Sequence, residues 1–410
     1  MSPTRTNPQL SRSKTGGQPD HKLLAIPGPV EVSDNVLSAL AQPPISHVSP
    51  EFARIFQQAI LLSRKVVGSQ YGQPFIIAGS GTLGWDQVGA NLIERGDRAL
   101  VVSTGYFGEG FKDCLLSYGA QVTTLKAPVL GETVPFSAIE AALRDQEYKL
   151  ITITHVDTST GVLSDIRGIA ELVKKVSPST LVVLDAVCSV GCEEIKMDIW
   201  GLDIVLTASQ KAIGAPPGLS ILIASQRAVK AYSNRKTPVQ GYYASWKKWL
   251  PIMESYMVAK PAYFGTQAVN LVYALAEALS ELMKGGEEGL AARIEAHKKA
   301  ARRLRAVAAQ LGMKSLAAAG AEAAGLSAVW VPEGLRATEI IQKANARGVV
   351  FAGGLLADVK DRYIRIGHMG VSVVEGERGD VDRISEVLRT IIGELLEERR
   401  SERRDGNIPV

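Results

Sequence analysis

The chain has 410 residues, of which 46% are hydrophobic and 21% charged, and its net charge is +4 (46 basic minus 42 acidic side chains). This length and composition predict two globular domains with a substantial core. The small net charge gives no argument for binding nucleic acid, and no apolar stretch approaches the length of a membrane span.

Neither end of the chain carries a strong targeting signal. Several basic and hydroxyl residues and no acid precede Asp20, which fits a mitochondrial presequence only weakly and an unstructured arm equally well. We therefore expect a flexible arm at residues 1–22. The final residues, 407–410, are not the Ser-Lys-Leu peroxisomal address, so a cytoplasmic or mitochondrial location is expected. Three cysteines indicate a reducing compartment, and Cys188 and Cys192 are interpreted as core residues without a metal.

Short apolar runs alternate with helix-length segments between residues 70 and 225. Several runs are apolar throughout, as expected of strands whose sheet is covered by helices on both faces. The alternation predicts an α/β fold with a mostly parallel, doubly wound sheet, which binds ligands beyond the carboxyl ends of its strands. The predicted strands are residues 75–78, 99–103, 122–125, 150–154, 181–184, 204–208 and 219–224.

The composition and the residue pattern of the sequence change after a predicted helix at residues 268–283. Ala, Arg and Lys at helical spacing predict an amphipathic connecting helix at 289–311. A small α+β domain follows, with predicted strands at 326–331, 349–351 and 363–366 and predicted helices at 338–346 and 381–396. We expect a large domain at 23–285, a small C-terminal domain at 286–400 and a tail at 401–410.

A glycine-rich turn follows the first predicted strand and contains Ser80, Gly81 and Thr82. Glycines let backbone N–H groups approach an anion, hydroxyls add donors, and a helix N-terminus attracts negative charge. The turn is therefore a candidate phosphate cradle, with a plain tight turn as the alternative. It also matches the dinucleotide fingerprint G-x-G-x-x-G, but the next strand does not end in the ribose-binding acid.

Two residues beyond later strands are candidates for the same crevice. Phe107 follows the strand at 99–103 and could stack on a planar ring, although a core aromatic is as common an explanation. Thr158 follows the strand at 150–154 and could hydrogen-bond a ring substituent.

Asp185 and Lys211 close two strands that are consecutive in the sequence. A lysine at a strand end, beside the stiff turn Ala215-Pro216-Pro217-Gly218, is placed for Schiff-base chemistry, because a desolvated amine is nucleophilic. A carboxylate paired with a cationic heterocycle, together with an imine-forming lysine, is the arrangement that pyridoxal phosphate requires. Taken alone, a loop-capping acid and a solvated lysine are the better explanations.

Arg365 lies between apolar residues on a strand of the small domain. A guanidinium in such a place favours bidentate capture of a carboxylate, and a structural ion pair is an equal alternative.

Taken together and in this order, these residues resemble the class V branch of the fold-type-I pyridoxal-phosphate enzymes, and within it the alanine–glyoxylate (serine–pyruvate) aminotransferases. The tract from Asp185 to Glu194 is most similar to fungal members. The most specific motif is Ser209-Gln210-Lys211-Ala212. The moderately specific ones are Pro27-Gly28-Pro29, Ser80-Gly81-Thr82, Gly105-Tyr106-Phe107-Gly108, Asp157-Thr158-Ser159-Thr160-Gly161, Tyr263-Phe264-Gly265-Thr266 and Arg365-Ile366-Gly367.

The resemblance implies pyridoxal 5′-phosphate as the cofactor of a large cofactor-binding domain. Lys211 would form the internal aldimine and Asp185 would bind the pyridine nitrogen. Phe107 would stack on the ring, and Thr158 would bond near its phenolic oxygen. Some animal members have Trp in place of Phe107, which keeps a stacking face and leaves the amino donor open.

The resemblance also implies a homodimer, because part of the phosphate site would come from the second subunit. The same chain would hold the phosphate through Ser80, Gly81, Thr82 and Gln210. The partner subunit would add Tyr263 and Thr266. Arg365 would bind the substrate carboxylate, and Gly28 would lie near the substrate.

The implied activity is transamination of L-alanine or L-serine with glyoxylate in a ping-pong cycle, giving glycine and, from alanine, pyruvate. Alternatives within the family are serine–pyruvate, ureidoglycine–glyoxylate and aminoethylphosphonate–pyruvate transfer. A cysteine desulfurase needs a mobile cysteine in the small domain, whereas all three cysteines precede residue 193. A nicotinamide-dependent dehydrogenase and a non-catalytic binding protein are remoter alternatives. Amino and 2-oxo acids are the expected partners, without nucleic acid, membrane or metal.

Overall fold

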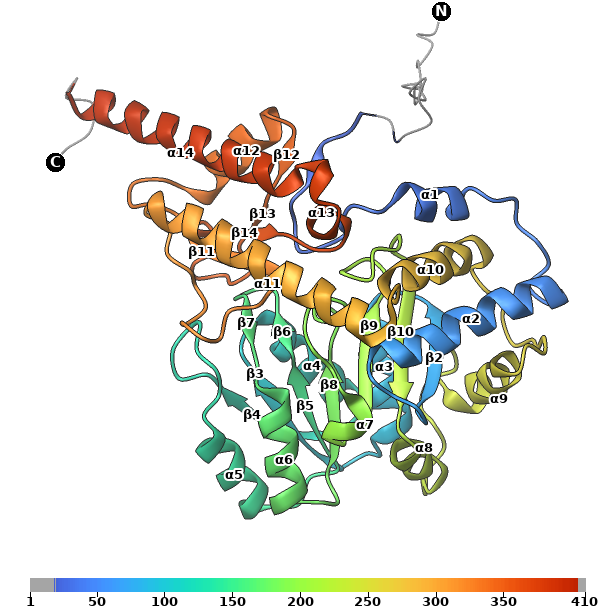
Figure 1. Ribbon diagram of the computed structural model, residues 1–410. Helices are drawn as coiled ribbons and strands as arrows, with labels where there is room; N and C mark the ends of the chain where they lie inside the picture. The colour runs from blue at the N-terminus through green and yellow to red at the C-terminus, as the bar shows by residue number, and fades with distance from the viewer. Residues whose placement is uncertain (1–17, 19, 405–410) are drawn as a thin grey trace, which may run out of the picture.

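A central sheet of seven strands organises the large part of the molecule (Figure 1). The computed structural model describes residue 18 and residues 20–404. The strand order is β2-β10-β9-β8-β5-β3-β4. In this sheet β10 alone runs in the opposite direction to the other strands. The predicted α/β fold with a mostly parallel sheet is therefore confirmed. The strands are β2 (Gln73–Ala78), β3 (Arg98–Ser103), β4 (Gln121–Lys126), β5 (Leu150–Thr154), β8 (Leu181–Asp185), β9 (Ile204–Ala208) and β10 (Leu219–Ala224).

Helices pack on both faces of this sheet (Figure 1). Every residue of β5, β8, β9 and β10 is buried, which explains why these strands are mostly apolar. Local signals start several helices: Ser49 caps the helix that begins at Pro50, and Asp165 caps the one that begins at Ile166. The helices are α1 (Asp34–Leu40), α2 (Pro50–Val66), α3 (Thr82–Leu92), α4 (Tyr106–Ser117), α5 (Phe136–Asp145), α6 (Ile166–Val176), α7 (Met197–Trp200), α8 (Gln226–Ser233), α9 (Trp246–Met257) and α10 (Val269–Leu282).

A second hydrophobic core lies around the C-terminal third of the chain, where Val329, Ile364 and Leu388 are fully buried. Its antiparallel sheet has the order β11-β14-β13. The division of the chain near residue 285 stays a prediction. The elements here are α11 (Gly286–Gln310), β11 (Leu326–Trp330), α12 (Ala337–Ala346), β12 (Val349–Val350), β13 (Ala352–Gly353), β14 (Tyr363–Gly367), α13 (Val371–Val374), the 3-10 turn Gly376–Arg378 and α14 (Asp380–Arg404).

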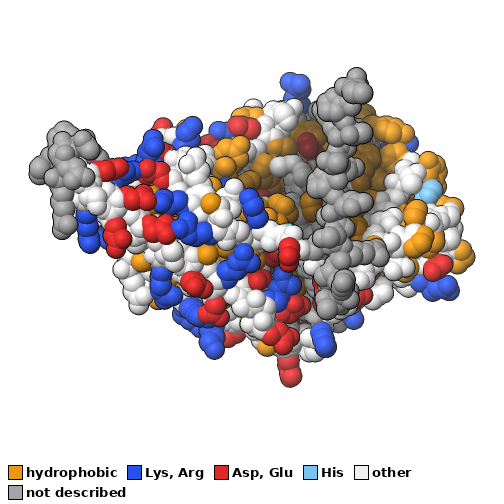
Figure 2. All heavy atoms as spheres, turned by 90° about the horizontal axis from the view of Figure 1, so that it is seen from above, with side chains coloured by type: hydrophobic (Ala, Val, Ile, Leu, Met, Phe, Trp, Pro, Cys, Tyr) orange, Lys and Arg blue, Asp and Glu red, His pale blue; other side chains and the backbone are white. Residues whose placement is uncertain are grey.

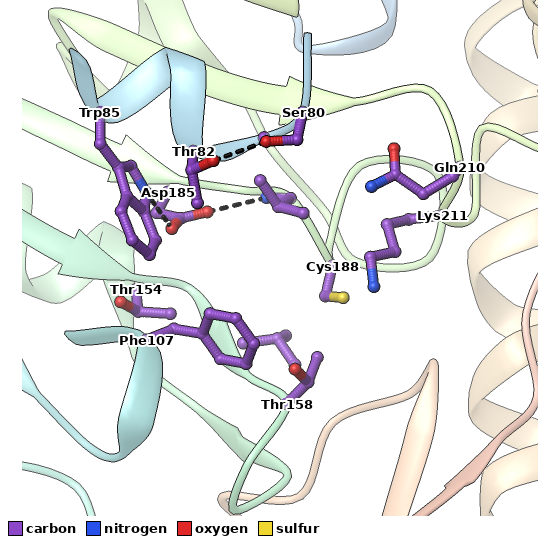
Figure 3. Close-up of a pocket in the computed structure, with 13 residues that line it drawn as sticks. Ser80, Thr82, Trp85, Phe107, Thr154, Thr158, Asp185, Cys188, Gln210 and Lys211 are labelled. Atoms are coloured by element: carbon purple, nitrogen blue, oxygen red, sulfur yellow. Dashed lines mark hydrogen bonds between the residues drawn. The ribbon is translucent and has the colours of Figure 1, made fainter. Parts of the chain in front are cut away.

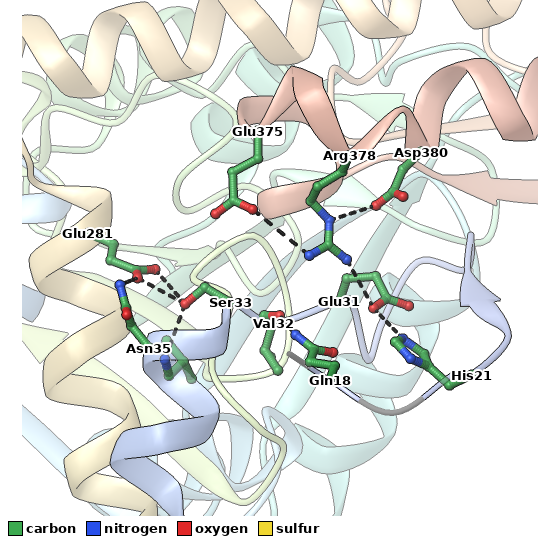
Figure 4. Close-up of polar contacts among 11 residues, drawn as sticks. Gln18, His21, Glu31, Val32, Ser33, Asn35, Glu281, Glu375, Arg378 and Asp380 are labelled. Carbon is green, nitrogen blue, oxygen red and sulfur yellow. Dashed lines mark hydrogen bonds and ion pairs between the residues drawn. The ribbon is translucent and has the colours of Figure 1, made fainter. Parts of the chain in front are cut away.

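Residues 23–33, here called the N-terminal strap, connect the two cores (Figure 4). The strap begins with β1 (Leu23–Leu24), which pairs in parallel with β12. The buried carboxylate of Glu31 accepts a bond from the Leu24 N–H at 2.8 Å and lies 3.5 Å from a guanidinium nitrogen of Arg378. At its other end, the Ser33 hydroxyl donates to Glu281 at 2.9 Å. The strap is thus held by the C-terminal elements and by α10 together.

The predicted arm at residues 1–22 lies almost entirely outside the described residues. No helix in the described part of the chain combines the length and the apolarity needed to cross a bilayer. Those same residues contain no grouping of three or more His, Cys, Asp or Glu side chains that could hold a metal ion.

Candidate active site

A cavity of about 150 Å³ lies where the parallel strands end (Figure 3). Asp185 is the last residue of β8, and Thr154 is the last residue of β5. The sheet topology therefore delivers these side chains to one edge, as expected of a doubly wound fold. The predicted site residues that line the cavity are Ser80, Gly81, Thr82, Phe107, Thr158, Asp185, Gln210 and Lys211.

The Asp185 carboxylate is 4% exposed and has a fixed donor on each oxygen. The indole N–H of Trp85 donates to Oδ2 at 2.8 Å, and the backbone N–H of Val187 donates to Oδ1 at 3.1 Å. Burial raises the pKa of Asp185 to about 6, although both hydrogen bonds and the charge of Lys211 act to lower it. The carboxylate is therefore ionised at neutral pH and is oriented before any ligand binds.

Lys211 enters the cavity from the side opposite Asp185 (Figure 3). It follows β9 in a loop whose start is fixed by Ser209, because the Ser209 hydroxyl donates to the Pro216 carbonyl at 2.6 Å. The Lys211 ammonium donates to the carbonyl of Pro27 in the N-terminal strap. Strap and loop are also joined by the Val30 N–H, which donates to the Gln210 carbonyl at 3.2 Å.

Gly28 does not line the cavity itself, but it packs directly against Lys211. A Cβ at position 28 would lie 2.5 Å from Lys211 Cδ and 2.6 Å from Nζ. The residue also has φ +106°, a conformation that side chains with a Cβ rarely adopt. Only glycine fits here without displacing the lysine.

Ser80, Gly81 and Thr82 form the turn between β2 and α3. The two hydroxyl oxygens lie 2.5 Å apart, and no side chain caps the N-terminus of α3. Nearby, the Oε1 atom of Gln210 is buried without a hydrogen-bond partner among the described residues. One of the two hydroxyls donates to the other, so the second O–H remains as a donor in the turn, whereas the Gln210 oxygen is an acceptor that awaits a donor.

Asp157 fixes the loop that carries Thr158 against the start of α4. Its Oδ2 accepts bonds from the N–H groups of Phe107 at 3.1 Å and Gly108 at 3.3 Å, and its Oδ1 accepts one from the Ser159 hydroxyl at 2.6 Å. Burial raises the pKa of Asp157. One buried carboxylate thus positions both Phe107 and Thr158.

Arg365 lies next to the cavity, on β14. Its Nε donates to the Gly353 carbonyl at 2.7 Å and its Nη1 to the Thr158 carbonyl at 3.3 Å. Burial lowers the pKa of Arg365. The guanidinium has five N–H groups, so donors remain beyond these two bonds for a carboxylate.

Tyr263 and Thr266 lie away from the cavity of their own chain. They are exposed in the loop before α10, where the Tyr263 side chain is 65% exposed and its ring centroid is 5.2 Å from that of His47. Tyr242 and Tyr243 are also exposed. Seen from above, hydrophobic side chains gather around a hollow in the half of the molecule away from α14, whereas charged side chains cover the other half (Figure 2).

The cavity also has lining residues that sequence reasoning missed, among them Trp85, Val187 and Cys188. Trp85 is a buried residue of α3, and no sequence pattern distinguishes a helix residue that faces a cavity from one that faces the core. Val187 and Cys188 follow Asp185 directly, so their place beyond a strand end was a usable signal.

Comparison with known proteins gives a consistent picture. A family model described as aminotransferase class V matches residues 34–354. Alanine–glyoxylate aminotransferase 1 of Saccharomyces cerevisiae is 45% identical over 360 residues, covering 85% of this chain and 92% of that protein. Serine–glyoxylate aminotransferase of Methylorubrum extorquens is 30% identical over 364 residues, covering 86% and 87%. The crystal structure of an alanine–glyoxylate aminotransferase from Nostoc sp. superposes with a TM-score of 0.84 at 28% identity, covering 91% of this chain and 96% of that one.

Proposed function

The chain belongs to the class V aminotransferase family, and we propose that it transfers the amino group of L-alanine to glyoxylate with pyridoxal 5′-phosphate as cofactor. The observation that carries the proposal is that Lys211 and Asp185 face each other across one cavity. A single flat aromatic aldehyde can meet both groups only in such an arrangement.

The residues present fit this cofactor. A pyridine nitrogen needs a buried acid, and Asp185 is a buried carboxylate that is ionised at neutral pH. A phosphate needs donors, and the uncapped N-terminus of α3 stands beside the hydroxyls of Ser80 and Thr82. Gly81 lets the turn pack closely against Val187, since a Cβ at this position would lie 2.8 Å from a methyl carbon of that residue.

Each side chain then has a role that its position supports. When bound, the cofactor withdraws electrons from the substrate's α-carbon, so that the α-proton becomes acidic. Lys211 Nζ would hold the aldehyde before substrate binds, then take the α-proton and return it to the carbon that carried the aldehyde. Asp185 would keep the ring nitrogen protonated, Phe107 would stack on the ring, and Thr158 would bond beside it.

The remaining residues are assigned to binding the substrate and the phosphate. Arg365 would bind the substrate carboxylate with its unused N–H groups, and Gly28 would lie near the substrate, where its lack of a Cβ leaves room for Lys211. Gln210 would help to hold the phosphate. Tyr263 and Thr266 of the partner subunit would complete the phosphate site, and their exposure in one chain supports a homodimer.

The test uses purified protein reconstituted with the cofactor. We expect a visible absorption band that disappears on adding alanine and returns on adding glyoxylate. Serine and aminoethylphosphonate as donors, and pyruvate as acceptor, are compared in the same assay, because relatives named for different donors share this family. Bleaching by none of these donors would overturn the proposed alanine–glyoxylate transfer, and bleaching by serine alone would correct the donor.

A further inference from the structure

Trp85, on α3, reaches Asp185 at the end of β8. Its indole N–H donates to Asp185 Oδ2 at 2.8 Å, and its side chain lines the cavity while being only 8% exposed. The bond joins residues 100 positions apart, so it exists only in the folded chain. Among the residues described, Asp185 is the one carboxylate that lines this cavity.

The indole is held in place from two directions. It stacks on Phe111 of α4, with ring centroids 5.3 Å apart and an interplanar angle of 14°. It also lies close to Gly110, where an added Cβ would be 3.1 and 3.2 Å from two carbons of the indole. Any residue larger than glycine at position 110 would therefore press on the ring. The N–H group is a fixed donor because the packing of α3 on α4 fixes the ring that carries it.

We propose that Trp85 is a positioning residue for the cofactor's ring nitrogen, acting through Asp185. Its N–H group fixes the rotation of the carboxylate and stabilises its negative charge, so that an oxygen lone pair faces the cavity. This inference rests on the cofactor assignment under Proposed function. A hydrogen bond to the ionised form of an acid favours that form, which opposes the effect of burial on this carboxylate.

A purely space-filling Trp85 is the alternative, since a buried indole N–H usually finds some acceptor. The two explanations differ in what the ring nitrogen contributes. A residue that only lines the cavity affects the binding of every planar ligand of the same shape. A residue that acts through Asp185 affects only the binding of ligands that have a ring nitrogen facing Asp185. Phenylalanine at position 85 keeps an aromatic wall and removes the donor.

The experiment compares two ligands on the apoprotein by absorbance or fluorescence titration. One is pyridoxal 5′-phosphate, and the other is its deaza analogue, in which a C–H group replaces the ring nitrogen. Trp85→Phe should weaken binding of pyridoxal 5′-phosphate about tenfold, because a hydrogen bond to a charged group is lost. Binding of the deaza analogue should stay within about twofold. Equal losses for both ligands, or no loss for either, would overturn the proposal.

Trp246→Phe is the matched control. Trp246 is fully buried, donates its indole N–H to Gln87 at 3.2 Å and does not line the cavity. This variant loses an equivalent donor and should bind both ligands as the wild type does. A selective loss for pyridoxal 5′-phosphate in this control would show that any indole donor has the effect, and would contradict the special role of Trp85.

Gly110→Ala keeps the test decisive if Trp85→Phe does not fold. The added methyl group would lie 3.1 and 3.2 Å from two indole carbons, so the ring must shift by a few tenths of an ångström while Asp185 stays unchanged. The longer hydrogen bond should lower the preference for pyridoxal 5′-phosphate over the deaza analogue by about threefold. An unchanged preference would contradict the proposal. Wild-type protein that binds neither ligand would overturn the proposed function as well, whereas binding with the same preference in all variants would remove only the role of Trp85.

Discussion

Asp185, at one end of the cavity, is fixed by groups that all belong to the large core, whereas Lys211, at the other end, contacts the N-terminal strap that joins the two cores. Asp185 is held by Trp85 and by its own neighbour Val187. Lys211 contacts the N-terminal strap, and Arg365 comes from the sheet of the second core. The difference indicates that the ring end is preorganised by the large core, while the substrate end depends on how three segments are placed relative to one another.

The largest expected effect is at the amine itself. Lys211→Ala should lower kcat by at least about 10⁴-fold, since no other group would move the α-proton. The melting temperature should stay within a few degrees, because the side chain is only half-buried. Single-turnover kinetics with alanine measures the loss. Lys175→Ala, at an exposed position on α6, is the matched control. Turnover near the wild-type rate in Lys211→Ala would rule out the assigned amine.

Arg365 tests whether the substrate end depends on the second core. Arg365→Lys keeps the charge but loses the planar fork, so we expect KM for alanine to rise about 100-fold, corresponding to about 3 kcal/mol of carboxylate recognition. Arg362→Lys is the control, since Arg362 is exposed and lies over Trp330, 5.6 Å from the ring centroid. An unchanged KM in Arg365→Lys would place the carboxylate elsewhere.

Gly28 tests the contribution of the strap. Gly28→Ala would bring a methyl carbon 2.6 Å from Lys211 Nζ and would strain a backbone at φ +106°. We expect kcat to fall about tenfold while KM changes less, because the displaced group is the amine. Gly376→Ala serves for comparison, since a Cβ there meets nothing within 4 Å. Equal kinetics in the two variants would show that the strap does not position the lysine.

The last prediction concerns the stability of the ring end in the apoprotein and not the rate of turnover. Burial raises the pKa of Asp185 from 3.8 to about 6, so the unfolded chain loses this proton at a lower pH than the folded one. The group therefore destabilises the fold as pH rises from about 4 to about 6, by up to about 3 kcal/mol. Asp185→Asn removes this dependence.

Urea unfolding of both apoproteins at pH 4 and pH 8 measures that difference. The free energy of unfolding of Asp185→Asn relative to the wild type should increase with pH. Glu193, whose pKa burial raises to about 7, is present in both proteins and cancels in the comparison. A relative stability that is constant with pH would show that Asp185 does not titrate in this range.

Much of the ring end could be predicted from the sequence. Apolar runs revealed β8 and β9, and the parallel sheet then required Asp185 and Lys211 to reach the same edge. The prediction missed Trp85, because its partner is 100 residues away and helical periodicity shows only that a residue is buried. The sequence pattern also could not show that β10 is antiparallel, because an apolar run looks the same whichever direction the strand takes.

The substrate end was less accessible to sequence reasoning. The expected strand at 349–351 ends at Val350 in the structure, and the chain divides there into β12, which pairs with the strap, and β13 at Ala352–Gly353, which pairs with β14. That division depends on a partner more than 300 residues away. The roles of Tyr263 and Thr266 depend on a second chain and stay predictions. In both cases the sequence shows which residue is present but not which distant strand or second chain it contacts.

The strap has a consequence for how the N-terminus can be processed. Leu23 pairs with β12, Ala25 is fully buried in the second core, and Pro27 accepts the bond from the lysine. A peptidase that trims the chain while preserving activity must therefore cut upstream of Leu23. A cut only a few residues later would separate Pro27 and Gly28 from their anchor, so the need to position Lys211 limits how far the N-terminus can be trimmed.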